Sequence, residues 1–144
     1  MDAFDWKILD EVQHAGRKSL TELARKVGLS IPTTADRLKK LEESGVIEAF
    51  VARVNPKKAG YEITALIGIT TSQPSKARLL KLLESIPEVI ECLHVTGADS
   101  YVMRVIAKDI SQLEKLIARI NVFGETRTSI VMSTSIPARP VKRP

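Results

Sequence analysis

The segment "GLSIPTTADRLKKLEESGVI", residues 28–47, predicts a tight turn, a helix and the start of a strand. Gly28 suits the turn because glycine readily adopts the left-handed backbone conformation. Ser30 can cap the helix, and Pro32 falls in the first turn, where a missing N–H costs little. The predicted buried face carries apolar side chains: Ile31, Ala35, Leu38 and Leu41. The opposite face carries hydroxyls and cations: Thr33, Thr34, Arg37 and Lys40.

Two more helices are predicted before this segment. Asp2 precedes an apolar spacing typical of a helix, which we expect to end at Gly16. Ser19 and Glu22 have the spacing of a capping box and open a second helix that stops at Gly28. After the third helix, "VIEAFVARV" (46–54) has strand character. Three helices followed by a strand pair are the layout of a winged helix-turn-helix domain.

The exposed face of the third helix is predicted to bind DNA. In a helix-turn-helix the recognition helix lies in the major groove, with its N-terminal residues near the base edges. Hydroxyls can bind bases or phosphates, Arg37 can bind guanine or phosphate, and Lys40 is suited to phosphate. The start of the second helix can bind a further phosphate. The predicted DNA-binding residues are Ser19, Thr21, Ser30, Pro32, Thr33, Thr34, Arg37 and Lys40.

The distribution of charge agrees with this prediction. The 144-residue chain has a formal net charge of +5. Residues 17–40 contain seven basic and two acidic side chains, so this window alone carries as much net charge as the chain. A basic surface attracts an anionic partner. A merely solvated face of two helices is the alternative, and charge alone does not exclude it.

The second half of the chain predicts a different kind of domain. "NPKKAGYE" (55–62) contains turn residues and marks a boundary. We expect these elements to follow: a strand at 63–71, a helix from Pro74, strands at 89–95 and 100–107 joined by a hairpin at "TGAD" (96–99), a helix led by a Ser111–Glu114 capping box, and a strand at 125–135. This β-α-β-β-α-β order is ferredoxin-like. Helices cover one face of such a sheet, so a second copy is expected on the other.

The predicted fold class is α+β, with four segments along the chain. These are a winged helix-turn-helix domain at 1–50, a linker at 51–61, a ferredoxin-like domain at 62–137 and a basic, proline-rich tail at 138–144. We expect the tail to be poorly ordered. No apolar run approaches the ~20 residues of a membrane span, and the N-terminus lacks a signal-peptide layout. We therefore expect a cytoplasmic protein without a membrane partner.

The sequence resembles the Lrp/AsnC family of feast/famine transcription regulators. The resemblance begins with "D-x-x-D-x-x-IL-x-x-V" from Asp2 and "LTELARKVGLS" (20–30). It continues through "RLKKLEESGVI" (37–47), "VNPKKAG" (54–60), "VTGADSYVMRV" (95–105) and "TRTSIVMS" (126–133). Each motif is weak alone, but all of them occur in order and at the right spacing over nearly the whole chain.

The resemblance implies a homodimer that assembles further, often into an octamer, and an amino acid or similar metabolite bound between subunits. Carried over by position, the effector-binding residues are Gly97, Ala98, Asp99, Ser100, Thr126 and Thr128. Many relatives have an acidic residue directly before the aromatic residue of this hairpin. Here Ser100 precedes Tyr101, and the acid, Asp99, comes one residue earlier. The identity of the effector therefore stays open.

Other readings of these residues and of the chain remain. "TGAD" is alternatively only a hairpin turn. Cys92 and His94 share a strand face, but no third group would complete a catalytic or metal site, and a place in the core is expected. A single cysteine also excludes an intrachain disulfide. No phosphate loop, dinucleotide fingerprint or zinc-protease motif occurs, so neither an enzyme nor a cofactor is predicted.

RNA binding on a β-α-β-β-α-β sheet requires stacking aromatics, and these strands offer only Tyr101. An architectural protein that wraps DNA without an effector is the remaining alternative. The sequence therefore predicts a transcription regulator that binds specific DNA sites and responds to an amino acid.

Overall fold

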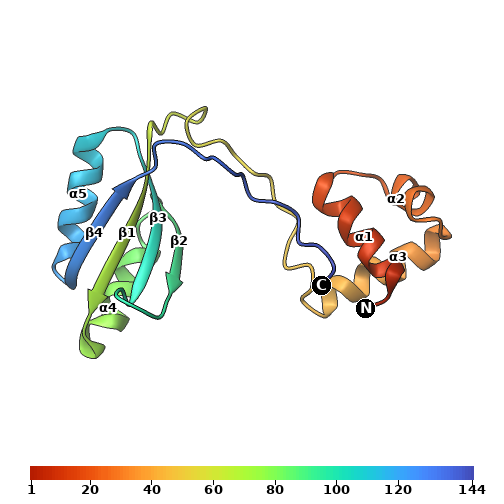
Figure 1. The fold of residues 1–144 in the computed structure, drawn as a ribbon, viewed down its shortest axis with the longest axis horizontal. Helices are drawn as coiled ribbons and strands as arrows, with labels where there is room; N and C mark the ends of the chain where they lie inside the picture. The colour runs from red at the N-terminus through yellow and green to blue at the C-terminus, as the bar shows by residue number, and fades with distance from the viewer. The chain divides into compact units, whose positions relative to one another are not determined.

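The computed structural model describes residues 1–144 and divides the chain into two compact units (Figure 1). The helical unit contains Met1–Arg53 together with Ile136–Pro144, and the sheet unit contains Val54–Ser135. The first break in the chain thus falls within the segment 51–61. The last residues of the chain belong to the unit that contains the first ones.

The helical unit is built from three short helices: α1 (Ala3–His14), α2 (Leu20–Val27) and α3 (Ile31–Glu43). The predicted caps are confirmed. Ser19 and Glu22 form the capping box of α2, and the hydroxyl of Ser30 accepts from the N–H of Thr33 at the start of α3. Gly28 ends α2 in the left-handed conformation with φ of 78°. The core of the unit contains Ile8, Leu9, Leu23, Val27 and Leu41.

The predicted strand after α3 is absent. Residues 46–53 form neither a strand nor a ladder with another segment of the chain. A strand exists only where a neighbouring strand accepts its hydrogen bonds, and the strand character of a sequence cannot supply that neighbour. Phe50 and Val51 are accordingly exposed, at 48% and 83% of their surface.

The basic tail was expected to be poorly ordered, but it packs against α1. The side-chain amide of Gln13 donates to the carbonyl of Val141 at 3.1 Å and accepts from the Val141 N–H at 2.7 Å. Lys142 forms an ion pair with Asp10. Local sequence gave no sign of this contact, because the partners lie 128 or more residues apart.

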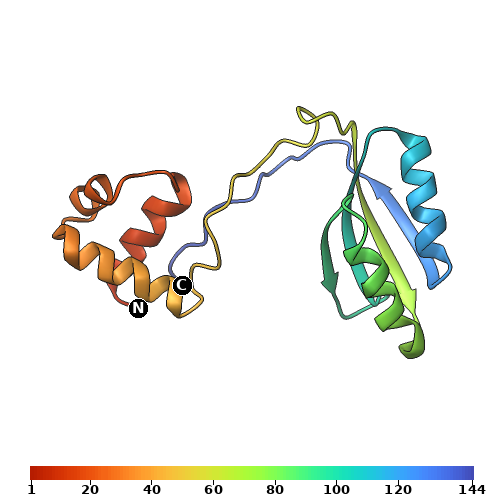
Figure 2. The ribbon, with the colours of Figure 1, turned by 180° about the vertical axis from the view of Figure 1, so that it is seen from behind.

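The sheet unit has the predicted β-α-β-β-α-β order. Its elements are β1 (Ile63–Thr71), α4 (Gln73–Glu84), β2 (Val89–His94), β3 (Tyr101–Ala107), α5 (Ile110–Asn121) and β4 (Gly124–Ile130). The strands pair antiparallel in the order β2-β3-β1-β4, which is the ferredoxin-like arrangement. Both helices cover the same face of this sheet (Figures 1 and 2).

Two local predictions for this unit were wrong. Asp109, not Ser111, caps α5, because the Asp109 carboxylate accepts from the N–H of Gln112. Several polar residues occur near this helix start, and Asp109 is the N-cap because it directly precedes Ile110, the first residue of α5. β4 ends at Ile130, five residues before the predicted end. The N–H of Val131 makes one further hydrogen bond, to the carbonyl of Thr64, close to the start of β1 at Ile63, and residues beyond Val131 have no strand left to pair with.

Alternation along the strands separates a covered face from an open face. Ile67, Ile69 and Met103 point toward α4 and α5 and are fully buried. The intervening residues of β1 lie on the open face, where Leu66 is 37% exposed. Leu93 of β2 lies on that face too and is 49% exposed. None of the helices is long and apolar enough to cross a membrane.

Candidate nucleic-acid interface and effector site

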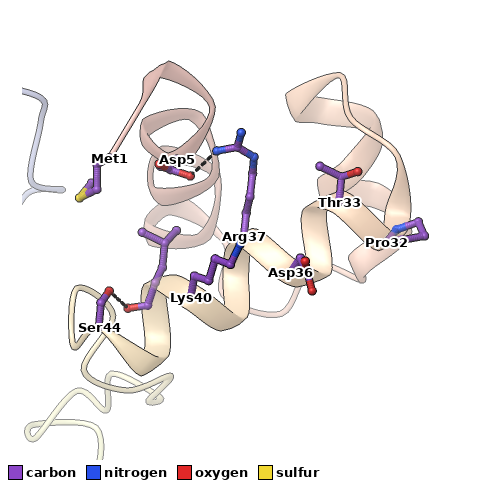
Figure 3. A pocket seen from close by; sticks show the side chains of 9 residues that line it. Met1, Asp5, Pro32, Thr33, Asp36, Arg37, Lys40 and Ser44 are labelled. Atoms are coloured by element: carbon purple, nitrogen blue, oxygen red, sulfur yellow. Dashed lines mark hydrogen bonds and ion pairs between the residues drawn. The ribbon is translucent and has the colours of Figure 1, made fainter.

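The outer face of α3 borders a hollow of about 690 Å³ beside the N-terminal end of α1 (Figure 3). Its lining residues are Met1, Asp5, Pro32, Thr33, Asp36, Arg37, Lys40, Leu41 and Ser44. Four of the predicted DNA-binding residues are thus brought together, namely Pro32, Thr33, Arg37 and Lys40. Asp36 lies among them and was not predicted.

Thr34 was predicted to face DNA, and this was wrong. Its side chain is fully buried, and its hydroxyl donates to the carbonyl of Ser30 at 2.9 Å. Ile31, expected in the core, is 45% exposed. Thr34 lies four and seven residues before Leu38 and Leu41, so it shares their face of the helix. Because the Ser30 carbonyl satisfies its hydroxyl, burying a threonine there costs little.

Arg37 lies at the edge of the outer face and is held by α1. One guanidinium nitrogen, Nη1, donates to Oδ2 of Asp2 at 2.8 Å and to Oδ1 of Asp5 at 2.7 Å. The guanidinium also lies 5.7 Å from the ring centre of Phe4. Hydrogen bonds from the backbone N–H of Asp5 and from Arg37 lower the pKa of Asp2. Both bonds of Arg37 use Nη1, so Nη2 and Nε keep their donors for another partner.

The charges around the interface are mostly unpaired cations. Lys18 pairs with Glu11 at 2.8 Å, and Lys39 lies 3.5 Å from Glu43. The other basic side chains of residues 17–40, apart from Arg37, are exposed and make no ion pair: Arg17, Arg25, Lys26 and Lys40. These groups give the helical unit a positive surface near α2 and α3, as DNA binding requires.

The predicted hydroxyls are partly occupied by caps. Ser19 accepts from the N–H of Glu22 and donates to its carboxylate. The hydroxyls of Ser30 and Thr33 lie 2.7 Å apart and share a hydrogen bond. Thr21 is exposed in the first turn of α2. Thr21 is therefore the predicted hydroxyl without a partner in the chain, and Thr33, which lines the hollow, can contact a ligand only while it shares its hydroxyl with Ser30.

The second candidate site lies at the hairpin between β2 and β3. The Asp99 carboxylate lies directly over Gly68 of β1, so close that a Cβ on Gly68 would come within 2.6 Å of it. Arg127 of β4 binds the same carboxylate, with Nη2 2.5 Å from Oδ1. Gly68 and Arg127 are paired in the ladder, so this ion pair lies on the open face of the sheet.

The hairpin is fixed to β1 by its backbone. The hydroxyl of Thr70 donates to the carbonyl of Ala98 at 2.8 Å, and the N–H of Ser100 donates to the carbonyl of Ile69 at 2.8 Å. Gly97 adopts φ of 114°, a conformation that suits glycine. The hairpin therefore presents Asp99 from a fixed position.

Thr126 and Thr128, predicted with less specific support, do not join this site. The register places them beside Ile69 and Ile67, whose side chains point to the helices. The hydroxyl of Thr126 donates to the side chain of Asn121 in α5. Strand residues alternate between faces, so both threonines lie on the face opposite Asp99.

Gly68 and Arg127 were missed as members of the site. An isolated glycine inside a strand often marks a close approach of another group, and Gly68 in "LIGIT" (66–70) carried that signal. Arg127 had no comparable signal, because its pairing with Asp99 depends on the strand order.

The predicted place in the core is confirmed in part for Cys92 and was wrong for His94, which is exposed because β2 is an edge strand of the sheet. Cys92 is half-buried against the core, and burial raises the pKa of its thiol, which suppresses the reactive thiolate. The His94 ring packs on Tyr101 with 5.0 Å between ring centres. Neither side chain belongs to the two candidate sites.

Comparison with known families identifies a related domain for each of the two units. Residues 1–48 match the winged helix-turn-helix DNA-binding family, and residues 64–141 match the Lrp/AsnC ligand binding domain. The chain belongs to the Lrp/AsnC family. It is a helix-turn-helix transcription regulator, as the sequence predicted, and its α+β architecture of a helix-turn-helix domain and a ligand-binding domain is that of the family.

Three members of the Lrp/AsnC family illustrate the similarity. The transcriptional regulator LrpA of Mycobacterium tuberculosis is 36% identical over 141 residues, covering 93% of this chain and 91% of that protein. The structure of LrpC from Bacillus subtilis superposes with a TM-score of 0.91 at 26% identity, covering 96% and 99% of the two chains. A feast or famine regulatory protein from M. tuberculosis, complexed with L-methionine, has a TM-score of 0.88 at 35% identity, covering 96% of each chain.

Proposed function

We propose that this regulator binds specific double-stranded DNA sites through α3 and that an amino acid bound at the Asp99–Arg127 site modulates the binding. The observation that carries the first half is the row of exposed polar residues on the outer face of α3, flanked by unpaired cations. Such a helix fits the major groove, where side chains reach the base edges. We assign no catalytic step to the protein, and we place its action in the cytoplasm.

The proposed DNA contacts fall into two kinds. Thr33 and Pro32, in the first turn of α3, approach base edges, whereas Lys40, about two turns later, binds a phosphate. At the start of α2, Ser19 and Thr21 flank free backbone N–H groups that suit a second phosphate. Arg37 offers only Nη2 and Nε, so its contribution to DNA is a phosphate contact that depends on its position against α1.

The effector half rests on the chemistry of the ion pair at the hairpin. A free amino acid carries an ammonium and a carboxylate. The Asp99 carboxylate can bind the ammonium and the Arg127 guanidinium can bind the carboxylate, and these two side chains lie 2.5 Å apart. The amides of Gly97 and Ala98 add donors for the carboxylate. The L-methionine complex of the M. tuberculosis relative supports this class of ligand. On binding, an α-amino acid would break the ion pair between Asp99 and Arg127 and form one ion pair with each of these side chains.

We further propose that the protein is a homodimer that assembles into a higher oligomer, with the octamer as the leading arrangement. The open sheet face supports this, since Leu66 and Leu93 are exposed there without a covering layer. A second copy would bury them and place two recognition helices on one DNA site. A two-fold dimer reads a pseudo-palindrome, because the symmetry of the site mirrors that of the protein.

Two measurements on the purified full-length protein test this function. Selection from a random DNA library reports sequence specificity, and enrichment of no motif would contradict the first half. Thermal unfolding with each standard amino acid reports the effector. A ligand at ~100 times its dissociation constant adds ~2.7 kcal/mol, so a bound amino acid raises the unfolding midpoint.

The variant Asp99→Asn with the same amino acids tests the location of the effector site. We expect the midpoint shift to disappear in this variant and to persist in Asp109→Asn, which changes an acidic helix cap elsewhere in the unit. If no amino acid shifts the wild-type protein while a DNA motif is still selected, the architectural alternative is favoured, in which the oligomer wraps DNA without an effector.

A further inference from the structure

The centre of the outer face of α3 is an acidic side chain, Asp36. Successive residues of an α-helix are rotated by about 100°. The buried side of α3 is fixed by Thr34, Leu38 and Leu41, and Asp36 lies about 160° to 220° around the helix from each of them. Asp36 therefore points directly away from the core of the helical unit.

Asp36 is exposed and makes no hydrogen bond or ion pair within the chain. Lys40, four residues later, has the spacing for a helical ion pair, yet the structure contains no contact between the two groups. In Figure 3, Arg37 reaches toward Asp5 on α1, whereas Asp36 projects from another side of α3. The neighbouring arginine is thus neutralised by α1 and leaves this carboxylate unpaired.

An unpaired carboxylate is an unusual group to bring against DNA, because every phosphate repels it. It is tolerated in the major groove only where a base donates a hydrogen bond to it. Guanine presents two acceptors there, thymine presents an acceptor and a methyl group, and adenine presents one acceptor beside its amino group. Cytosine presents its N4 amino group alone. A carboxylate is therefore accommodated best by cytosine, less well by adenine, whose N7 acceptor lies beside its amino donor, and not by guanine or thymine, which offer no donor.

We infer that Asp36 selects a cytosine at one position of each half-site, by accepting a hydrogen bond from its N4 amino group. This inference rests on the proposed DNA-binding function and names a specificity-determining residue for it. Thr33 lies one turn before Asp36 and Lys40 one turn after it, so a phosphate bound by Lys40 places Asp36 deeper in the groove. The carboxylate then also disfavours guanine at that position.

Substitution of Asp36 predicts a change of base preference, not only a loss of affinity. In Asp36→Asn the side chain gains a donor, and an amide pairs with the adjacent N6 and N7 of adenine. The preferred base at the affected position should therefore change from cytosine to adenine. In Asp36→Ala the preference should fall by roughly 5- to 100-fold at that position alone. All other positions of the motif should stay as in the wild type.

The experiment is selection from a random DNA library with the full-length wild type, Asp36→Asn, Asp36→Ala and Glu42→Gln. Glu42 is an exposed acid on the same helix, away from the outer face, so Glu42→Gln controls for the loss of one negative charge. This control should retain the wild-type motif even if its overall affinity rises. Thermal unfolding should be unchanged in all three variants, because the substituted side chains are exposed.

A cytosine preference that becomes adenine in Asp36→Asn supports the inference. A wild-type motif retained in both Asp36 variants overturns it while leaving the proposed function intact. A wild type that selects no motif overturns both, so failure of the inference and failure of the proposed function give different results.

Discussion

Nη1 of Arg37 lies 2.7 Å from Oδ1 of Asp5, and this contact fastens the middle of α3 to the first turn of α1. The side chains are 28% and 16% exposed, so the pair is largely shielded from water. The same nitrogen reaches Asp2, the N-cap of α1. One cation thus links the cap of one helix to the outer face of another.

This link predicts that Arg37→Ala destabilises the helical unit. Removal of the cation leaves two carboxylates close together without a partner, and such a loss costs more than the pair contributed. The unfolding midpoint, followed by the fluorescence of Trp6, should fall. Trp6 is the single tryptophan and lies in this unit.

Lys40→Ala is the matched control, because Lys40 is an exposed cation of the same helix with no ion pair. Its unfolding midpoint should equal that of the wild type, while the dependence of DNA affinity on salt should become shallower by ~1. An equal unfolding midpoint for Arg37→Ala and Lys40→Ala would contradict the claim that Arg37 stabilises the helical unit.

The adjacent threonines of α3 predict opposite effects of the same substitution. Thr34→Val removes a buried hydroxyl bond to the Ser30 carbonyl and should lower the free energy of unfolding by about 1 kcal/mol. DNA affinity should be almost unchanged once the protein is folded. Thr33→Val should leave the stability within ~0.5 kcal/mol, as at most surface positions, and should weaken DNA binding. Denaturant unfolding and DNA titration of both variants test this contrast, and a larger binding loss in Thr34→Val would contradict it.

The helical unit is also predicted to be sensitive to acid. Hydrogen bonds lower the pKa of four of its carboxyl groups: Asp2, Asp10, Glu11 and Glu22. Because the folded unit binds these protons less readily than the unfolded chain, protonation favours unfolding. Their contribution to stability is therefore present above about pH 4 and is lost as the pH falls through the lowered values.

Trp6 fluorescence during an acid titration measures this sensitivity. In Asp2→Asn the stability should depend less steeply on pH between about pH 2 and 4, because one of the responding groups has been removed. Asp36→Asn, which removes an exposed carboxyl group without a partner, should keep the wild-type slope. Identical slopes in all three proteins would show that the bonds of Asp2 do not contribute.

Two glycines of the sheet unit predict different responses to alanine. A Cβ at Gly124 would come within 2.0 Å of the Thr70 carbonyl oxygen, and the backbone there cannot move aside. Gly124→Ala should therefore cost about 1–3 kcal/mol of stability. At Gly68 the obstacle is the Asp99 carboxylate, which can rotate away. Gly68→Ala should keep the fold and abolish the stabilisation by an amino acid.

Gly16→Ala is the control for both substitutions, because its Cβ would meet only ordinary contacts of 3.5 Å or more. Thermal unfolding with and without the amino acid compares the three variants. A Gly68→Ala protein that still responds to the effector would place the binding site away from the Asp99 carboxylate.

Features that depend on near neighbours in the chain were predictable from sequence. The boundaries of β1 and the caps at Ser19 and Ser30 were predicted correctly, because each depends on residues within a few positions. Repeating apolar spacing also identified both helices of the sheet unit. Thr34 was assigned to the wrong face because threonine was treated as a polar, exposed residue. Its hydroxyl in fact donates to the carbonyl of Ser30 in the preceding turn, which allows the side chain to be buried.

Features that depend on distant partners were not predictable in the same way. The missing strand at 46–53, the tail contact at Val141 and the Asp99–Arg127 pair each require a segment far away in the chain. The face assigned to Thr126 and Thr128 depended on the register of β4 against β1, and a shift of one residue exchanges the two faces. Arg127, between the two threonines, is the residue that the register brings to Asp99.

The contact between Gln13 and Val141 also has a practical consequence for protein engineering. The helical unit is assembled from both ends of the polypeptide, since Ile136–Pro144 belongs to it together with Met1–Arg53. A chimera that exchanges DNA-binding domains between regulators by a single cut after Arg53 would transplant an incomplete unit, because residues Ile136–Pro144 would stay behind on the donor. Such a graft needs two junctions, and a purification handle is better attached to a surface loop than to Pro144.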